Sequence, residues 1–122
     1  MHSEIILELV KIQTQFKFLH WQTKSYAKHN AYGGFYDSLT DLIDKYAEVC
    51  MGKHGRPDFG GDFNLEFKDI KTFSSQTFLD NATDFIVSIA EKLDSKKDTD
   101  LLNIKDEILA EVNKLKYLLT LS

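Results

Sequence analysis

The hydrophobic residues of this chain recur with a helical period in several stretches, and the first stretch is the clearest. From the N-terminus they alternate in steps of four and three, at Ile5, Leu9, Ile12, Phe16 and Leu19. Such spacing places side chains on one face of an α-helix, here called the main seam. Ser3 is the predicted N-cap, and Glu4 lies in the first turn, where the helix dipole favours an anion.

The first helix also carries apolar residues away from the main seam. At about 100° per residue they fall on other sides of the helix, and they are Ile6, Leu7, Val10, Phe18 and Trp21. A helix that is apolar on both sides is usually buried on both sides. Because a chain of 122 residues makes only a small bundle, we expect a second subunit to cover the outer side of this helix.

The second helix follows a short turn at residues 23–25, and Ser25 is its predicted N-cap. Its seam consists of Tyr32, Tyr36, Leu39, Ile43, Tyr46 and Cys50. Gly33 and Gly34 lie inside this helix, where each glycine costs about 1 kcal/mol relative to alanine. Two explanations are open for them: a close approach of another helix, or a local kink.

After the second helix the periodicity is lost, and residues 52–74 form a connection rich in glycine. We expect it to cross the end of the bundle, anchored by Phe59, Phe63, Phe67 and Phe73. A third helix is predicted from about Ser75, and a fourth with Asp98 or Thr99 as its N-cap. Two helices, a long connection and two more helices predict an all-α, ferritin-like four-helix bundle with a long crossover between helices 2 and 3.

Length and composition indicate one domain over residues 1–122. The net charge of −4 argues against binding DNA, which needs a basic surface. No apolar run approaches the twenty or so residues that a membrane span needs, and residues 1–4 lack the basic start of a signal peptide. Cys50 is the only cysteine, so the cytoplasm is the expected compartment, or the host cytoplasm if the protein is viral.

Candidate chemistry gathers around the first turn and the second helix. His20 and His29 flank the turn, so both imidazoles are expected at the same end of the bundle. The second helix carries a stripe of carboxylates that points about 140–200° away from its own seam: Asp37, Asp41, Asp44 and Glu48. One interpretation is a solvated helix face. The other needs a second subunit, whose carboxylates would join the histidines in a nitrogen–oxygen site suited to iron, manganese or zinc.

These residues resemble the Dps family of mini-ferritins, within the ferritin-like superfamily. The resemblance rests on Leu19-His20-Trp21, on His29 at the start of the next helix, and on the D-x-x-x-E pattern of Asp44 and Glu48. It implies an inter-subunit site in which His20 and His29 of one subunit and Asp44 and Glu48 of the two-fold partner bind iron and oxidise it, with ferric mineral stored in a shell.

The same resemblance sets expectations for the surroundings of the site. Trp21, Asp37 and Asp41 would lie beside the metal or at the interface. The homo-oligomer would be at least a dimer, with a dodecameric shell as the larger alternative. The chain also resembles short Dps-like proteins of tailed phages.

The chain departs from the Dps pattern in three ways, of which the missing acid at Gly33 favours an alternative function, whereas the retained histidine pair with the D-x-x-x-E pattern favours iron binding. His20 and His29 are nine residues apart, three fewer than is usual in Dps, and Gly33 stands where Dps has an acid. The basic N-terminal tail that holds DNA is missing. The alternative is a non-catalytic helical protein, viral in origin, that acts through protein–protein interaction.

The remaining titratable residues are given structural roles. His2 and His54 are predicted to be exposed bystanders. Cys50 is expected to pack as a small hydrophobe, and Tyr32, Tyr36 and Tyr46 to lie in the core with bonded hydroxyls.

Overall fold

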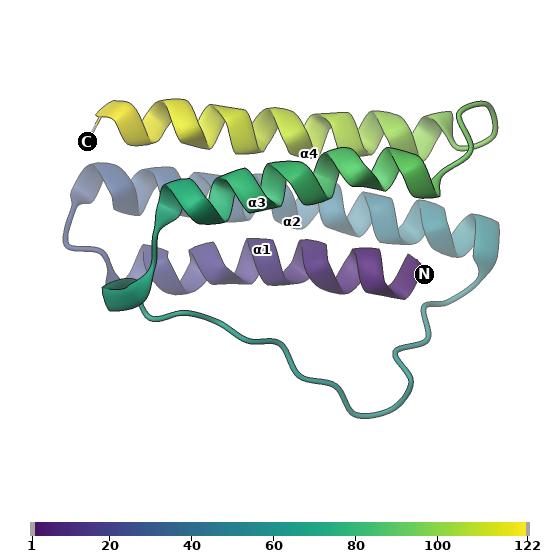
Figure 1. Ribbon diagram of the computed structural model, residues 1–122, viewed down its shortest axis with the longest axis horizontal. Coiled ribbons are helices and arrows are strands. Elements are labelled where there is room, and N and C mark those ends of the chain that lie inside the picture. The colour runs from purple at the N-terminus through teal and green to yellow at the C-terminus, as the bar shows by residue number, and fades with distance from the viewer. Residues whose placement is uncertain (1, 122) are drawn as a thin grey trace.

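The computed structural model describes residues 2–121, and these form a four-helix bundle (Figure 1). The predicted all-α fold is confirmed. The four long helices are α1 (His2–Gln22), α2 (Tyr26–His54), α3 (Ser75–Ser88) and α4 (Thr99–Leu118). Three short 3₁₀ helices accompany them: η1 (Ile70–Thr72), η2 (Ile89–Lys92) and η3 (Leu119–Leu121).

The connection between α2 and α3 runs the length of the bundle beside α1 (Figure 1). Because it returns the chain to the end where α2 began, α3 runs parallel to α2, while α1 and α2 are antiparallel neighbours. The predicted long crossover between the second and third helices is therefore confirmed, but the expectation that it crosses the end of the bundle is wrong, because it runs along the side of the bundle. Residues 55–69 of this connection, which contain no helix, are called the strap below.

Side-chain caps define where some of the helices begin. The Ser25 hydroxyl accepts a hydrogen bond from the Lys28 amide at 3.2 Å, as predicted for the N-cap of α2. The cap predicted at Ser3 is wrong, because α1 already begins at His2; the Ser3 hydroxyl accepts instead from the Asp58 amide in the strap. Asp98 precedes α4 as predicted, but its carboxylate accepts from the Asp94 amide and not from α4.

The main seam of α1 forms the centre of the core. All five of its residues are essentially buried, and each such side chain contributes about 1.5–3 kcal/mol. Phe16 lies at the middle of an aromatic cluster, with ring-centroid distances of 4.9–5.9 Å to its neighbours Tyr32, Phe35, Phe73 and Phe78. Phe73, as predicted, anchors the end of the connection to the core.

The strap covers part of the side of α1 for which a second subunit was predicted. The Gln15 side chain exchanges two hydrogen bonds with the Lys68 backbone, at 2.8 and 2.9 Å. Phe67 packs edge-on against Phe18 at 5.0 Å. Ile6 is also buried within the chain. The prediction that another subunit covers the apolar residues away from the main seam is therefore wrong for Ile6, which its own chain buries. For Phe18 the prediction is wrong in part, because Phe67 of the strap already covers one side of its ring.

The phenylalanine anchors predicted for the connection are only partly correct. Phe59 and Phe63 pack against each other at 5.1 Å, and Phe63 stays half exposed. Hydrogen bonds also hold the strap to α1, such as the one that the Gln22 amide donates to the Asp69 carboxylate at 2.8 Å.

Candidate functional site

His20 and His29 stack on each other across the first turn. Their ring centroids are 3.8 Å apart and their planes are inclined by 19°. The Nδ1 atom of each ring lies within hydrogen-bond distance of the other residue's backbone carbonyl, at 2.7 and 2.9 Å. A carbonyl oxygen only accepts, so each Nδ1 carries the hydrogen and donates it. We call this reciprocal arrangement the histidine clasp; it ties the end of α1 to the start of α2.

Gly33 provides the space that the clasp needs. A Cβ atom at this position would lie 2.8 Å from Cε1 and 2.9 Å from Nδ1 of His20. Contacts that short do not occur between real side chains, so any other residue would displace the ring. Of the two explanations open for these glycines, close approach is correct for Gly33, whereas Gly34 has no atom within 4 Å of its Cβ position.

The clasp fixes what the two imidazoles can bind. With Nδ1 donating, the lone pair of each neutral ring is on Nε2, and metal-binding histidines commonly hold their other nitrogen in this way. A metal ion lies in the ring plane, about 2.1 Å from the nitrogen. The planes of the His20 and His29 rings are inclined by only 19°, and their centroids are 3.8 Å apart. Planes so nearly parallel do not intersect within a metal–nitrogen bond length of either ring. The stacked His20 and His29 rings therefore cannot both bind one ion in their planes.

The carboxylates predicted to share this site lie elsewhere on the same chain. Asp44 is fifteen residues beyond His29, which is about 22 Å along α2, and Glu48 is one turn further. Both are exposed, as are Asp37 and Asp41. Within residues 2–121, no three His, Cys, Asp or Glu side chains are placed to hold a metal ion. One chain brings the two histidines together and leaves the acids in solvent.

An exposed aromatic group lies next to the clasp. The indole of Trp21 is 64% exposed, although it is the last large apolar residue of α1. The Lys17 ammonium lies 5.4 Å from the Trp21 ring and 4.6 Å from the Tyr36 ring, so it joins the outer sides of α1 and α2 by two cation–π contacts. Sequence reasoning missed Lys17, although its spacing of four from Trp21 was a usable signal.

The other two histidines form a second stacked pair at the opposite end of the same two helices. His2 and His54 have ring centroids 4.2 Å apart and planes inclined by 13°. The prediction that they are exposed bystanders is wrong for His2, whose Nδ1 is buried. The pKa of His2 is lowered, first by burial and then by the charges of His54 and the amino terminus, while Asp98 acts to raise it.

Cys50 lies in the core beneath that second pair. Its side chain is 3% exposed, which confirms its prediction as a small hydrophobe. Burial raises the pKa of the thiol to about 11, with further contributions from Asp98 and Asp100. His2, Cys50 and His54 border a small hollow of about 210 Å³.

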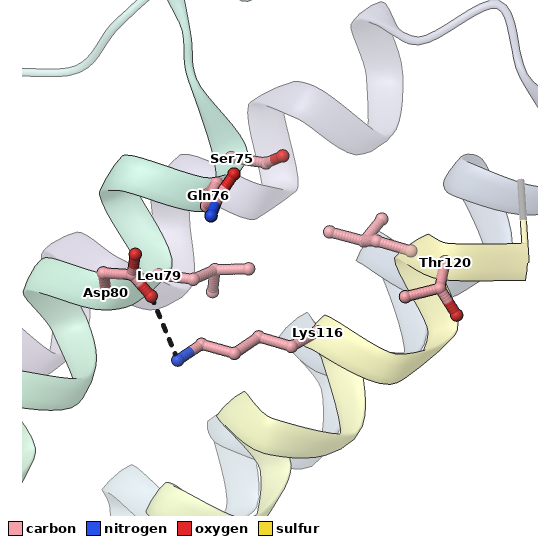
Figure 2. A pocket seen from close by; sticks show the side chains of 7 residues that line it. Ser75, Gln76, Leu79, Asp80, Lys116 and Thr120 are labelled. Atoms are coloured by element: carbon pink, nitrogen blue, oxygen red, sulfur yellow. Dashed lines mark ion pairs between the residues drawn. The ribbon is translucent and has the colours of Figure 1, made fainter.

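A hollow of about 340 Å³ lies between α3 and the end of α4 (Figure 2). The cation that faces it, Lys116, forms an ion pair with Asp80 at 3.3 Å and donates to the Thr83 hydroxyl at 3.0 Å. Its charge is thus already neutralised by the chain itself, and the hollow presents no unpaired cation for an anionic ligand. Hydrophobic periodicity does not predict this hollow.

The length and hydropathy of the helices indicate whether any of them could cross a membrane. Of the helices in the described part of the chain, none has the length and apolar character that crossing a bilayer requires.

The fold and the site define a class: a small all-helical protein whose first two helices are fastened at each end by a histidine pair. Residues 20–119 match a family of unknown function, DUF5856. That match covers most of the chain, so the protein belongs to this family.

One relative comes from a bacteriophage. A 48-residue stretch is 46% identical to a protein of Enterobacteria phage T4 described as an uncharacterized 14.6 kDa protein in the mobD-ri intergenic region. The similar stretch covers 39% of this chain and 38% of the phage protein. No solved structure matches the chain.

These comparisons overturn the resemblance to the Dps family. The family that matches is DUF5856, and nothing in either match indicates Dps or iron. The physical reason for the false resemblance is visible in the site. His20, His29 and Gly33 are explained by the clasp, and Asp44 and Glu48 lie on an exposed helix face.

Proposed function

We propose that this chain is a non-catalytic helical protein that acts by binding another protein chain through the outer side of α1 and α2. The observation that carries the proposal is a second seam on α1, here called the outer seam. It consists of Leu7, Val10, Thr14, Lys17 and Trp21, which recur in steps of three and four, together with the adjacent Phe18. None of these residues is fully buried, and Trp21 is the most exposed of them.

An exposed tryptophan held by its neighbours is typical of the residues that dominate binding at protein interfaces. Lys17 restrains the indole, and Phe18 packs against it at 6.0 Å, so little side-chain freedom remains to be lost on binding. The partner we propose is a second copy of the chain, which agrees with the homo-oligomer expected from the sequence. The phage relative supports a viral protein working in the host cytoplasm.

Light scattering over a dilution series tests this function. The wild-type protein should be larger than its 14.1 kDa chain at about 100 µM and approach the monomer on dilution. Trp21→Ala should shift association to higher concentration. Tyr117→Ser is the matched control, because Tyr117 is 61% exposed on α4 and should leave association unchanged. A wild-type monomer at every concentration would contradict the proposal.

A second candidate function is divalent-metal binding at the histidine clasp, with iron as the first ion to test and manganese or zinc as alternatives. The observation that favours it is the Nδ1 hydrogen bond to a carbonyl, which leaves Nε2 as a ligand. Since the stacked rings cannot share an ion, one histidine would bind it together with Asp44 and Glu48 of a second copy.

Calorimetric titration with ferrous iron under anaerobic conditions, repeated with zinc, tests this candidate. His29→Gln and Asp44→Asn should each abolish binding, and mixing the two variants should restore part of it. Binding that survives both substitutions, or that does not return although the subunits exchange, would contradict a site shared between copies.

A further inference from the structure

Two adjacent residues hold the start of α1 to the end of α2 and to the strap. The His2 ring stacks on the His54 ring, with centroids 4.2 Å apart and planes inclined by 13°. The Ser3 hydroxyl accepts a hydrogen bond from the Asp58 amide at 3.2 Å. We call these four residues the latch; it lies at the end of the bundle where α2 passes into the strap (Figure 1). The next hydrogen bond between the strap and α1 within residues 2–121 is at Lys68.

The latch covers the path from solvent to Cys50. All four latch residues border the hollow of about 210 Å³ that also has Cys50 in its lining. The Cys50 side chain is 3% exposed, whereas His54 is exposed. If the His2 and His54 rings part, the hollow opens, and water and reagents reach the thiol.

The latch suits neutral imidazoles, unlike the histidine clasp at the other end of α1 and α2. In the clasp, each Nδ1 donates its hydrogen to a carbonyl, and a ring that takes up a proton on Nε2 keeps that hydrogen bond. In the latch, the Nδ1 atom of His2 is buried and has no hydrogen-bond partner among residues 2–121. A protonated imidazole carries a hydrogen on both nitrogens. Charged His2 would therefore bury a donor that has no acceptor, which is unfavourable.

Positive groups around the stacked rings add to this effect. Two charged rings whose centroids are 4.2 Å apart repel each other, and the amino terminus places a further positive charge near His2. From the strap, Arg56 borders the same hollow. From the core, Cys50 adds no charge at neutral or acidic pH, because burial raises the pKa of its thiol to about 11.

The negative groups nearby have other partners. Asp98, which precedes α4, favours the charged form of His2, but Lys53 forms an ion pair with Asp98 at 3.4 Å. The Asp58 carboxylate accepts a hydrogen bond from the Gly60 amide at 2.9 Å. The balance favours neutral His2, since burial and then the neighbouring positive charges lower its pKa in the folded protein.

We propose that the latch is an acid-sensitive device: protonation of His2 and His54 parts their rings, releases the first turn of α1 from residues 55–58, and opens the hollow above Cys50. Once released, the imidazoles are surrounded by water and take up protons near the ordinary pKa of 6.5, so the open form binds more protons than the closed form. The population of the open form therefore rises as the pH falls below about 6.5. The device works within one chain and does not depend on the proposed function.

Labelling of Cys50 by a chromogenic pyridyl disulfide, which reacts with thiols in acid, measures the opening. The rate in urea divided by the rate in buffer at the same pH gives the protection of the thiol, and this ratio cancels the pH dependence of the reagent. Protection should fall by about tenfold between pH 7.5 and pH 5 in the wild-type protein, because the open form binds at least one more proton. Protection that does not change over this range overturns the proposal.

A matched reporter separates local opening from unfolding of the whole chain. Ala31 is 7% exposed and lies on α2 near the clasp. Ala31→Cys in a Cys50→Ala background therefore places a single buried thiol at the other end of the helix. Its protection should stay nearly constant while that of Cys50 falls. An equal fall at both thiols shows that acid unfolds the whole chain, and it overturns the proposal.

The His2→Gln substitution tests the imidazole itself. Glutamine does not titrate, so the protection of Cys50 in this variant should be the same at pH 7.5 and pH 5, and a fall as large as that of the wild type overturns the proposal. Hydrogen exchange of the wild-type protein needs no variant. After correction for the intrinsic exchange rate, residues 5–8 and 52–60 should exchange faster at pH 5 than at pH 7.5, and residues 30–38 should not. Exchange that accelerates in all three segments, or in none, overturns the proposal.

Discussion

The Nδ1 atom of His20 lies 2.7 Å from the backbone carbonyl oxygen of His29, and the Nδ1 atom of His29 lies 2.9 Å from that of His20. The His29 imidazole thereby satisfies one of the carbonyls that the C-terminal end of α1 leaves without a helical partner, and the His20 imidazole adds a hydrogen bond to a carbonyl in the first turn of α2. The pair closes the turn between α1 and α2 and fixes the position of Trp21 directly beside it. The residues that first suggested catalysis therefore serve to build the surface that we propose binds a partner.

The close approach at Gly33 predicts opposite effects for two neighbouring substitutions. Gly33→Ala should destabilise the protein by about 1–3 kcal/mol relative to Gly34→Ala, because only the first Cβ meets the His20 ring. Gly34→Ala should stabilise α2 by up to about 1 kcal/mol through helix propensity. Urea unfolding followed by circular dichroism measures both. Equal stability of the two variants would show that the ring moves aside without cost.

The hydrogen bonds of the clasp can be separated from its stacking. His29→Leu should cost about 1 kcal/mol or more of unfolding free energy, because the His20 carbonyl loses its donor. His29→Asn places an amide NH₂ near the position of Nδ1 and should recover part of that loss. Urea unfolding of both variants checks the order. If the His29→Asn variant is no more stable than the His29→Leu variant, the reciprocal hydrogen bonds are not what stabilises the turn.

The second histidine pair predicts how stability depends on pH. The pKa of His2 is lowered in the folded protein below its ordinary value of 6.5, so the folded state binds fewer protons than the unfolded state. The contribution of neutral His2 to the free energy of unfolding is therefore fully present above about pH 6.5, and it is lost as the pH falls through the pKa of His2 in the folded protein. Urea unfolding of the wild-type protein and of His2→Gln between pH 7.5 and 4.5 measures this contribution. If the unfolding free energies of the two proteins depend on pH in the same way, the predicted role of His2 is contradicted.

Cys50 predicts a slow thiol reaction in the folded protein. The side chain is 3% exposed and its thiol pKa is raised to about 11, so little thiolate is present or accessible at pH 8. Labelling by a chromogenic disulfide should be slow in buffer and fast in urea. Since the folded pKa lies above the ordinary 9.0, this group should also lower stability as the pH rises from about 9 to 11. A Tyr117→Cys variant, which labels fast, is the control for the reagent.

Local features of the fold could be predicted from the sequence, whereas distant pairings could not. The main seam of α1 and the cap at Ser25 depend on residues a few positions apart, and both are confirmed. The short turn likewise predicted that His20 and His29 approach each other. In contrast, Gln15 and Lys68 are 53 residues apart and pair through a backbone amide and carbonyl, which leave no trace in hydrophobic periodicity.

In the candidate site, too, some features could be predicted from the sequence and others could not. The sequence placed Asp44 and Glu48 on the outer side of α2, and the structure leaves both exposed. It did not predict that the His20 ring would fill the space above Gly33, because that depends on a side-chain rotamer. The resemblance to Dps failed for this reason, since histidines that satisfy backbone carbonyls follow the same short pattern as histidines that bind metal.

Trp21 is the only tryptophan in the chain, and it lies in the outer seam, so it reports directly on the proposed interface. The most direct measurement is acrylamide quenching of its fluorescence over a dilution series of the wild-type protein. If two copies pack through the outer seam, the quenching constant should fall and the emission should shift to shorter wavelength as concentration rises. A tryptophan that remains equally quenched at every concentration, in samples that light scattering shows to be associated, would contradict binding through this surface.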